Sequence, residues 1–166
     1  MHTINVLIGN SNPRVTNLIY SLVRSVCGDS ISVDCSRAMR VDEVLAQAVR
    51  NNFDLIIINP EDLCAAPERR RTTITIRQAV DAIRSIKTLR SAPVICVAVS
   101  PENDLLLSEA GANLVLGLPF NCEEFKEAIS RFVVFPEPEI EARQTRQSFA
   151  SAFLRGWEKF AASLSL

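Results

Sequence analysis

The chain alternates between two patterns of apolar residues, and each pattern predicts a different element. Short, nearly continuous apolar runs predict β-strands, at residues 4–9, 31–35, 55–58, 94–99 and 113–117. Between these runs, apolar residues recur every three or four positions and predict amphipathic helices, at residues 13–27, 41–49, 76–89, 104–110 and 122–132. Alternating strands and helices predict an α/β fold, a three-layer sandwich with right-handed crossovers. The common order for a five-stranded parallel sheet is 2-1-3-4-5.

Individual residues mark where two of these helices begin and end. Pro13 suits the first turn of a helix, and Gly28 follows the last apolar position of the same helix. Asn121 is a favoured N-cap residue, and Glu124 stands three positions later. Together these two residues predict a capping box at the start of the last helix of the sandwich.

The chain changes character at residues 134–139, where Pro136 and Pro138 exclude a continuous helix. We therefore expect a domain at residues 1–133, a proline-rich linker at 134–139 and an amphipathic helix at 140–166. One face of that helix carries large apolar side chains, namely Phe149, Phe153, Trp157, Phe160 and Leu164. The helix either folds back onto its own domain or packs against another subunit, through the same helix or a groove. Binding to a membrane surface is less favoured, because the polar face lacks dominant lysine.

The bulk composition narrows the classes of protein that fit. The net charge is −1, which gives no overall attraction to nucleic acid or to anionic membranes. The five cysteines are scattered and His2 is the single histidine, so we expect no disulfide framework, no metal site and no cofactor. The N-terminus has no signal-peptide pattern, and no run reaches the roughly 18 apolar residues of a membrane span. These features favour a cytoplasmic protein.

Several segments resemble one family. The segment from Glu109 to Phe120, Glu-Ala-Gly-Ala-Asn-Leu-Val-Leu-Gly-Leu-Pro-Phe, closely resembles the "AGA…KPF" signature of response-regulator receiver domains. The openings of two strands, Phe53-Asp54-Leu55 and Ala92-Pro93-Val94-Ile95, match the same family. The resemblance covers residues 4–133. It implies a flavodoxin-like or CheY-like fold and a place in two-component signal transduction.

Every position that carries chemistry in that family departs from the family's pattern here. The acidic pair that would hold magnesium is Asn10 and Ser11, and the phosphoacceptor aspartate is Asn59. The hydroxyl residue that ends the fourth strand is Ala98, and the lysine before the following proline is Leu118. An amide has no anionic oxygen to attack phosphorus, and magnesium needs anionic oxygen ligands. The resemblance therefore implies a degenerate pseudo-receiver that lacks the metal, the nucleophile and the phosphoryl clamp.

Two interpretations remain for the polar residues of this degenerate site. They form a neutral network that also caps the first helix, or together with Leu118 they line a small pocket for an uncharged ligand. Glu61 and Asp62 lie just past Asn59 and are conceivable as displaced phosphoacceptors. We favour ordinary loop acids for both, because the sequence places no lysine or metal site beside them.

Arginine is concentrated after the third strand, at Arg69, Arg70, Arg71, Arg77 and Arg84. Arg77 and Arg84 are seven residues apart and so share one face of a helix. The simplest interpretation is a solvated helix face beside a long loop. The alternative is a basic docking patch for an acidic protein partner. Nucleic acid is disfavoured, because no aromatic residues are interleaved with the arginines.

These features together predict a phosphorylation-independent receiver-like module that signals or scaffolds by protein–protein interaction. We expect a homodimer, formed through the helix at 140–166 or through the face made by the helices at 104–110 and 122–132. The alternative is a sensor that binds a neutral small ligand at the degenerate site. An enzyme is disfavoured, because the strand ends offer no histidine, no carboxylate pair and no glycine-rich phosphate loop.

Overall fold

The structure, a computed structural model, describes residues 2–64, 73–98 and 100–133. Within these ranges the chain forms one five-stranded parallel sheet in the order β2-β1-β3-β4-β5. The strands are β1 (His2–Gly9), β2 (Ile31–Ala38), β3 (Leu55–Ile58), β4 (Val94–Ala98) and β5 (Leu114–Gly117). The predicted α/β fold and the predicted strand order are confirmed.

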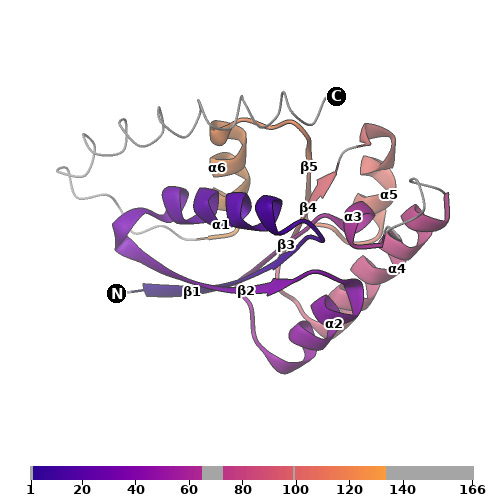
Figure 1. Ribbon diagram of the computed structural model, residues 1–166, viewed down its shortest axis with the longest axis horizontal. Helices are drawn as coiled ribbons and strands as arrows, with labels where there is room; N and C mark the ends of the chain where they lie inside the picture. Colours follow the sequence, from indigo (N-terminus) through magenta and orange to yellow (C-terminus); the bar gives the residue numbers. More distant parts are fainter. Residues whose placement is uncertain (1, 65–72, 99, 134–166) are drawn as a thin grey trace.

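Helices cover both faces of the sheet (Figure 1). They are α1 (Pro13–Cys27), α2 (Val41–Arg50), α3 (Pro60–Cys64), α4 (Thr73–Leu89), α5 (Asp104–Glu109) and α6 (Cys122–Ser130). Short 3-10 turns occupy Gly28–Ser30 and Pro101–Asn103. Helices α1 and α6 lie on one face of the sheet, and α2, α4 and α5 lie on the other. No helix in the described ranges has both the length and the apolar character needed to cross a membrane.

The central strands are buried on both sides. Neighbouring side chains of a strand point to opposite faces, so Val6 and Ile8 join the core under α1 and α6, whereas Leu7 joins the core under α2 and α4. All four residues from Leu55 to Ile58 are buried, which is the reason that β3 is an unbroken apolar run in the sequence. Each fully buried side chain of this size contributes about 1.5–3 kcal/mol to stability.

The predicted helix boundaries follow from local hydrogen bonds. Asn12 caps α1, because its side-chain oxygen accepts a hydrogen bond from the Arg14 N–H at 3.0 Å, and Pro13 occupies the first helical position. Gly28 ends α1 with φ of 62°, a conformation that favours glycine. Asn121 and Glu124 exchange hydrogen bonds of 2.8 and 2.9 Å at the start of α6, so the predicted capping box is confirmed.

Several boundaries shift by two or three residues from the prediction, and two differences have a clear local reason. The stretch from residue 60 was expected to be a loop, but Pro60–Cys64 form α3, because a helix of five residues is too short to show helical periodicity. β2 was expected to end at Cys35 and extends to Ala38. It does so because every residue of β2 pairs with β1, from His2 opposite Ile31 to Gly9 opposite Ala38.

Candidate functional site

The loop that follows β1 is built around the buried side chain of Asn10, which is only 1% exposed. Its Oδ1 atom accepts a hydrogen bond from the Asn12 N–H at 2.8 Å, the pattern of an Asx-turn. Its backbone N–H donates to the Ala38 carbonyl at 3.0 Å. The hydroxyl of the buried Thr16 donates to the carbonyls of Asn10 and Asn12, at 3.5 and 3.2 Å. Asn10 therefore shapes the turn that leads into α1.

Asn59 follows β3 and is also buried, with 5% of its surface exposed. Its backbone N–H donates to the Gly9 carbonyl at 2.9 Å, which places the ends of β1 and β3 side by side. Its Oδ1 atom accepts the Asp62 N–H at 3.0 Å, and Pro60 stands at the first position of α3. Asn59 is therefore the N-cap of α3.

Asp62 connects α3 to the loop after β1. Its Oδ2 atom accepts two hydrogen bonds from Ser11, one from the backbone N–H at 2.9 Å and one from the hydroxyl at 2.6 Å. A hydroxyl donating to a carboxylate at this distance forms a charge-assisted bond, stronger than one between neutral groups. This carboxylate is therefore already occupied by donors of the protein itself. We refer to Asn10, Ser11, Asn59 and Asp62 as the carboxyl-edge cluster.

Gly9 allows α3 to lie close against the sheet. A Cβ atom at this position would stand 2.9 Å from the Cγ2 atoms of both Ile58 and Val44, and 3.0 Å from the Cδ1 atom of Leu63. Real Cβ atoms are rarely found so near their neighbours. Because Leu63 belongs to α3, a side chain at position 9 would push this helix away from the end of β1.

The remaining two positions of the degenerate site contribute packing. Ala98 is buried at the end of β4, and its carbonyl accepts the Leu118 N–H at 2.8 Å. Leu118 is half-buried, precedes Pro119 through a cis peptide bond and packs against the core under α1 and α6. Among the described residues, no group of three or more His, Cys, Asp or Glu side chains is placed to hold a metal ion.

The thiols in the described core are not activated. Burial raises the pKa of Cys27 from 9.0 to about 11 and raises the pKa of Cys96 well above its usual range. Burial also raises the pKa of the half-buried Cys35 and Cys122. The thiolate is the reactive form of cysteine, so these thiols are poor nucleophiles at neutral pH.

The arginines predicted as a docking patch are only partly described. Arg69, Arg70 and Arg71 lie outside the described residues. Arg77 and Arg84 are exposed and line a groove of about 460 Å³ between α4 and α5, together with Val80, Asp81 and Leu106. The predicted contact face of the C-terminal helix, at residues 140–166, also lies outside the described residues.

Two other basic residues of this region are used inside the domain. Lys87 Nζ donates to the Ala92 carbonyl at 3.0 Å and to Asn113 Oδ1 at 3.2 Å. The guanidinium of Arg90 donates to the carbonyls of Ala48 and Val49 at the end of α2. The Arg90 contacts satisfy carbonyls that α2 leaves free at its C-terminus. The sequence pattern did not distinguish these basic residues from the exposed arginines. A basic residue that caps a neighbouring helix has the same pattern in the sequence as a solvated one.

No protein-family model matches the sequence, and no curated protein matches it. Solved structures do match. A CheY-like response-regulator receiver domain from Methanospirillum hungatei is 17% identical, covers 78% of this chain and 92% of its own, and gives a TM-score of 0.59. The receiver domain of a sensor histidine kinase from Pseudomonas aeruginosa, with magnesium coordinated in its active-site cleft, is 20% identical, with coverages of 78% and 97% and a TM-score of 0.58.

A third similar structure is the chemotaxis response regulator CheY4 of Vibrio cholerae. It is 20% identical, covers 79% of this chain and 99% of its own, and gives a TM-score of 0.57. At such identities a likeness establishes the fold and nothing finer. The described part of this chain has the fold of CheY-like receiver domains.

Proposed function

We propose that this chain is a phosphorylation-independent receiver-like module, which signals or scaffolds by protein–protein contact without turnover. The observation that carries the proposal is the pair of hydrogen bonds from Ser11 to the carboxylate of Asp62. This carboxylate places a negative charge at the carboxyl edge of the sheet, where sites of this fold class lie. An incoming phosphoryl group is itself anionic, and among the described residues no metal-binding cluster offsets the charge of this carboxylate.

The neighbouring groups support the same proposal. Phosphoryl transfer depends on positioning and on neutralising the charge of the transferred group. The oxygen of Asn59 is engaged as a helix cap, and Leu118 offers no positive charge. Asp62 is a poor phosphoacceptor, because its Oδ2 atom is held by two donors and among the described residues no metal cluster assists it. Binding to proteins through its surface is then the mode of action that remains for this chain.

Intact-protein mass spectrometry after incubation with acetyl phosphate and Mg²⁺ tests the proposal. We expect no mass increase corresponding to one phosphoryl group, under conditions that label a receiver domain used as a positive control. A labelled fraction that disappears in Asp62→Asn would contradict the proposal and would identify Asp62 as a displaced acceptor. A labelled fraction that persists in Asp62→Asn would also contradict the proposal, because another residue would then be the phosphoacceptor.

We also propose that the module is a homodimer and that the C-terminal helix at 140–166 contributes to the contact. The support is its apolar face, because large aromatic side chains bury about 150–250 Å² each when covered. Light scattering coupled to gel filtration on the full chain tests this. We expect a dimer for the native chain and a monomer for Phe153→Glu combined with Trp157→Glu. The matched control, Arg155→Glu on the polar face, should remain a dimer.

The ligand-sensor alternative has less support. The side-chain oxygens of Asn10 and Asn59 and the hydroxyl of Ser11 already bond to groups of the protein. An uncharged ligand that engaged these oxygen atoms would have to displace the bonds that they already make. Broad thermal-shift screening of neutral metabolites tests this alternative. A compound that raises the unfolding temperature of the native chain but not that of Asn59→Ala would support it.

A further inference from the structure

The groove between α4 and α5 is the surface feature that the proposed function leaves without a role. It combines an apolar floor with a basic rim. Val80 and Leu106 supply the floor, and Leu106 is 44% exposed while its neighbour Leu105 is 69% exposed. Exposed leucines that are rimmed by charged residues mark surfaces on which proteins dock.

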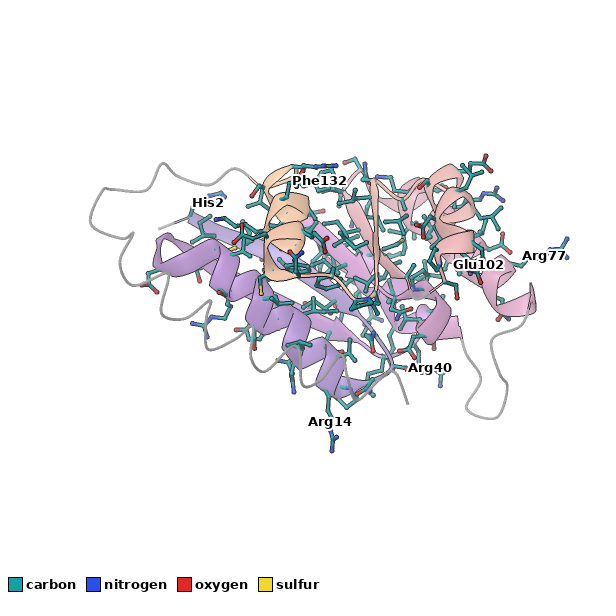
Figure 2. The ribbon with its side chains drawn as sticks, turned by 90° about the horizontal axis from the view of Figure 1, so that it is seen from above. His2, Arg14, Arg40, Arg77, Glu102 and Phe132 are labelled. Carbon is teal, nitrogen blue, oxygen red and sulfur yellow. The ribbon has the colours of Figure 1, made fainter. Side chains whose placement is uncertain are left out.

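The rim of the groove carries two available positive charges. Arg77 and Arg84 are both exposed, and neither forms an ion pair with any residue in the described ranges, where the two ion pairs are Arg40–Asp42 and Arg131–Glu127. Figure 2 shows Arg77 extending away from the body of the domain. Asp81 also lines the groove, one turn from each arginine, and leaves it with a net positive charge. The groove therefore suits an acidic segment that also offers small apolar side chains.

The chain itself contains such a segment. Residues 137–141 read Glu-Pro-Glu-Ile-Glu, with three acidic side chains alternating with Pro138 and Ile140. In an extended backbone, alternate residues point to opposite sides. If the segment binds in this form, with the expected helix beginning after Glu141 rather than at residue 140, then Pro138 and Ile140 lie on the side of the apolar floor and the glutamates on the other. Four extended residues span about 13 Å, and the seven residues from Arg77 to Arg84 rise about 10.5 Å along a helix. Flexible arginine side chains cover the difference.

The segment follows α6, which lies on the opposite face of the sheet from the groove of its own chain. The described part of the chain ends at Val133, which follows α6 on the opposite face of the sheet from α4. In a right-handed strand–helix–strand fold the helices run against the strands, so α6 ends near the amino edge and Arg77, in the first turns of α4, lies near the carboxyl edge. β4, with five residues, separates these edges by about 16 Å. The four residues from Val133 to Glu137 span at most about 14 Å when fully extended. This is less than the separation of the two edges, even before the chain passes around the sheet.

We propose that residues 137–141 of one copy dock in the α4–α5 groove of a second copy, with their glutamates facing Arg77 and Arg84. The inference rests on the proposed homodimer and names a second contact within it. In a two-fold symmetric dimer the exchange is reciprocal, so that the segment of each copy fills the groove of the other. Ion pairs at an exposed rim weaken with salt, so the dimer dissociates more readily at high ionic strength.

Charge reversal in the full chain tests the pairing. The groove variant carries Arg77→Glu and Arg84→Glu, and the segment variant carries Glu137→Arg, Glu139→Arg and Glu141→Arg. A control variant, Arg14→Glu with Arg50→Glu, changes the same number of exposed arginines on α1 and α2. Sedimentation equilibrium gives the dissociation constant of each dimer, and circular dichroism checks that each variant is folded.

We expect each reversed variant to raise the dissociation constant at least about tenfold, because attraction becomes repulsion at every rim contact. The control variant should leave it within about twofold. The decisive sample is an equimolar mixture of the groove and segment variants. In that heterodimer every acidic segment meets a basic groove and every basic segment meets an acidic groove, so native affinity should return. A contact within one chain is not rescued by mixing.

The outcomes separate this inference from the homodimer proposal. If the native chain is a monomer at all concentrations, both fail. If the native chain and both reversed variants dimerise equally well, the homodimer stands and the groove pairing is overturned. If both variants weaken the dimer but mixing restores nothing, the pairing of segment and groove between copies is overturned.

Discussion

Ser11 and Asp62, which are 51 positions apart in the sequence, are joined by two hydrogen bonds that end on the same carboxylate oxygen. The contact ties the loop after β1 to α3. Asn59 supports it from the other side, because its side chain caps the helix that presents Asp62. The carboxyl edge of this sheet therefore carries a network of linked hydrogen bonds. The effects of substitutions in this network on the free energy of unfolding should not be additive.

The first prediction concerns that coupling. Asp62→Ala should lower the free energy of unfolding by about 1–2 kcal/mol, since it removes a charge-assisted acceptor from two donors. Ser11→Ala should cost less, because the backbone N–H of residue 11 keeps its bond to Asp62. Urea unfolding of both single variants and the double variant gives the coupling energy. Strict additivity would show that the contact is absent in solution. Glu102→Ala, which removes another exposed carboxylate, serves as the control.

The second prediction concerns position 59. Asparagine and aspartate are equally good N-cap residues, so Asn59→Asp should leave α3 intact and still should not gain phosphorylation by acetyl phosphate. Asn59→Ala should lower stability by about 0.5–2 kcal/mol, as expected for the loss of a helix cap. Thermal unfolding and intact mass measure the two effects. Efficient labelling of Asn59→Asp would mean that the rest of the edge still supports phosphoryl transfer.

The third prediction uses two glycines as a matched pair. Gly9→Ala should destabilise the domain by about 1–3 kcal/mol, because its Cβ would crowd Val44, Ile58 and Leu63. Gly117→Ala should be close to neutral, because nothing lies within 4 Å of a Cβ at that position. Denaturant unfolding of both variants provides the comparison. Similar losses in the free energy of unfolding for the two variants would show that α3 does not pack closely against Gly9.

The fourth prediction is a pH dependence. The pKa of Cys27 is raised from 9.0 to about 11, so the folded state keeps the thiol proton that the unfolded state releases. Its contribution to stability is complete below pH 9 and is lost as the pH rises towards 11, by about 2 kcal/mol. The free energy of unfolding of Cys27→Ala should therefore fall less steeply between pH 9 and 11 than that of the native chain. Parallel pH profiles would contradict the buried placement of this thiol.

The elements that the sequence predicted well are those with a long periodic signal or a cap of known chemistry. The run from Leu55 to Ile58 specified a central strand, and Asn121 with Glu124 specified the start of α6, because both signals are complete within a few neighbouring residues. The strand order followed from general rules on connections and needed no particular residue. The strand and the cap depend on short-range chemistry, and the strand order on the geometry of chain connections.

The candidate site was harder, because its contacts join distant residues. Asp62 looked like a loop acid, and nothing in the pattern near it names Ser11 as its partner. A local signal for α3 was nevertheless present. Asn59, Pro60 and Asp62 occupy the cap, the first and the third positions of a helix, which are the positions each residue type favours. The helix was too short for periodicity to support that signal.

The contacts of Lys87 and Arg90 fix the C-terminal end of α4 to its neighbours. Lys87 anchors one end of the helix to Ala92 and Asn113, and Arg90, just past that end, is bonded to the carbonyls that close α2. α4 also packs beside α3. A partner docked in the groove would therefore contact the helix that lies against α3, and α3 carries Asp62, the acceptor of both Ser11 hydrogen bonds.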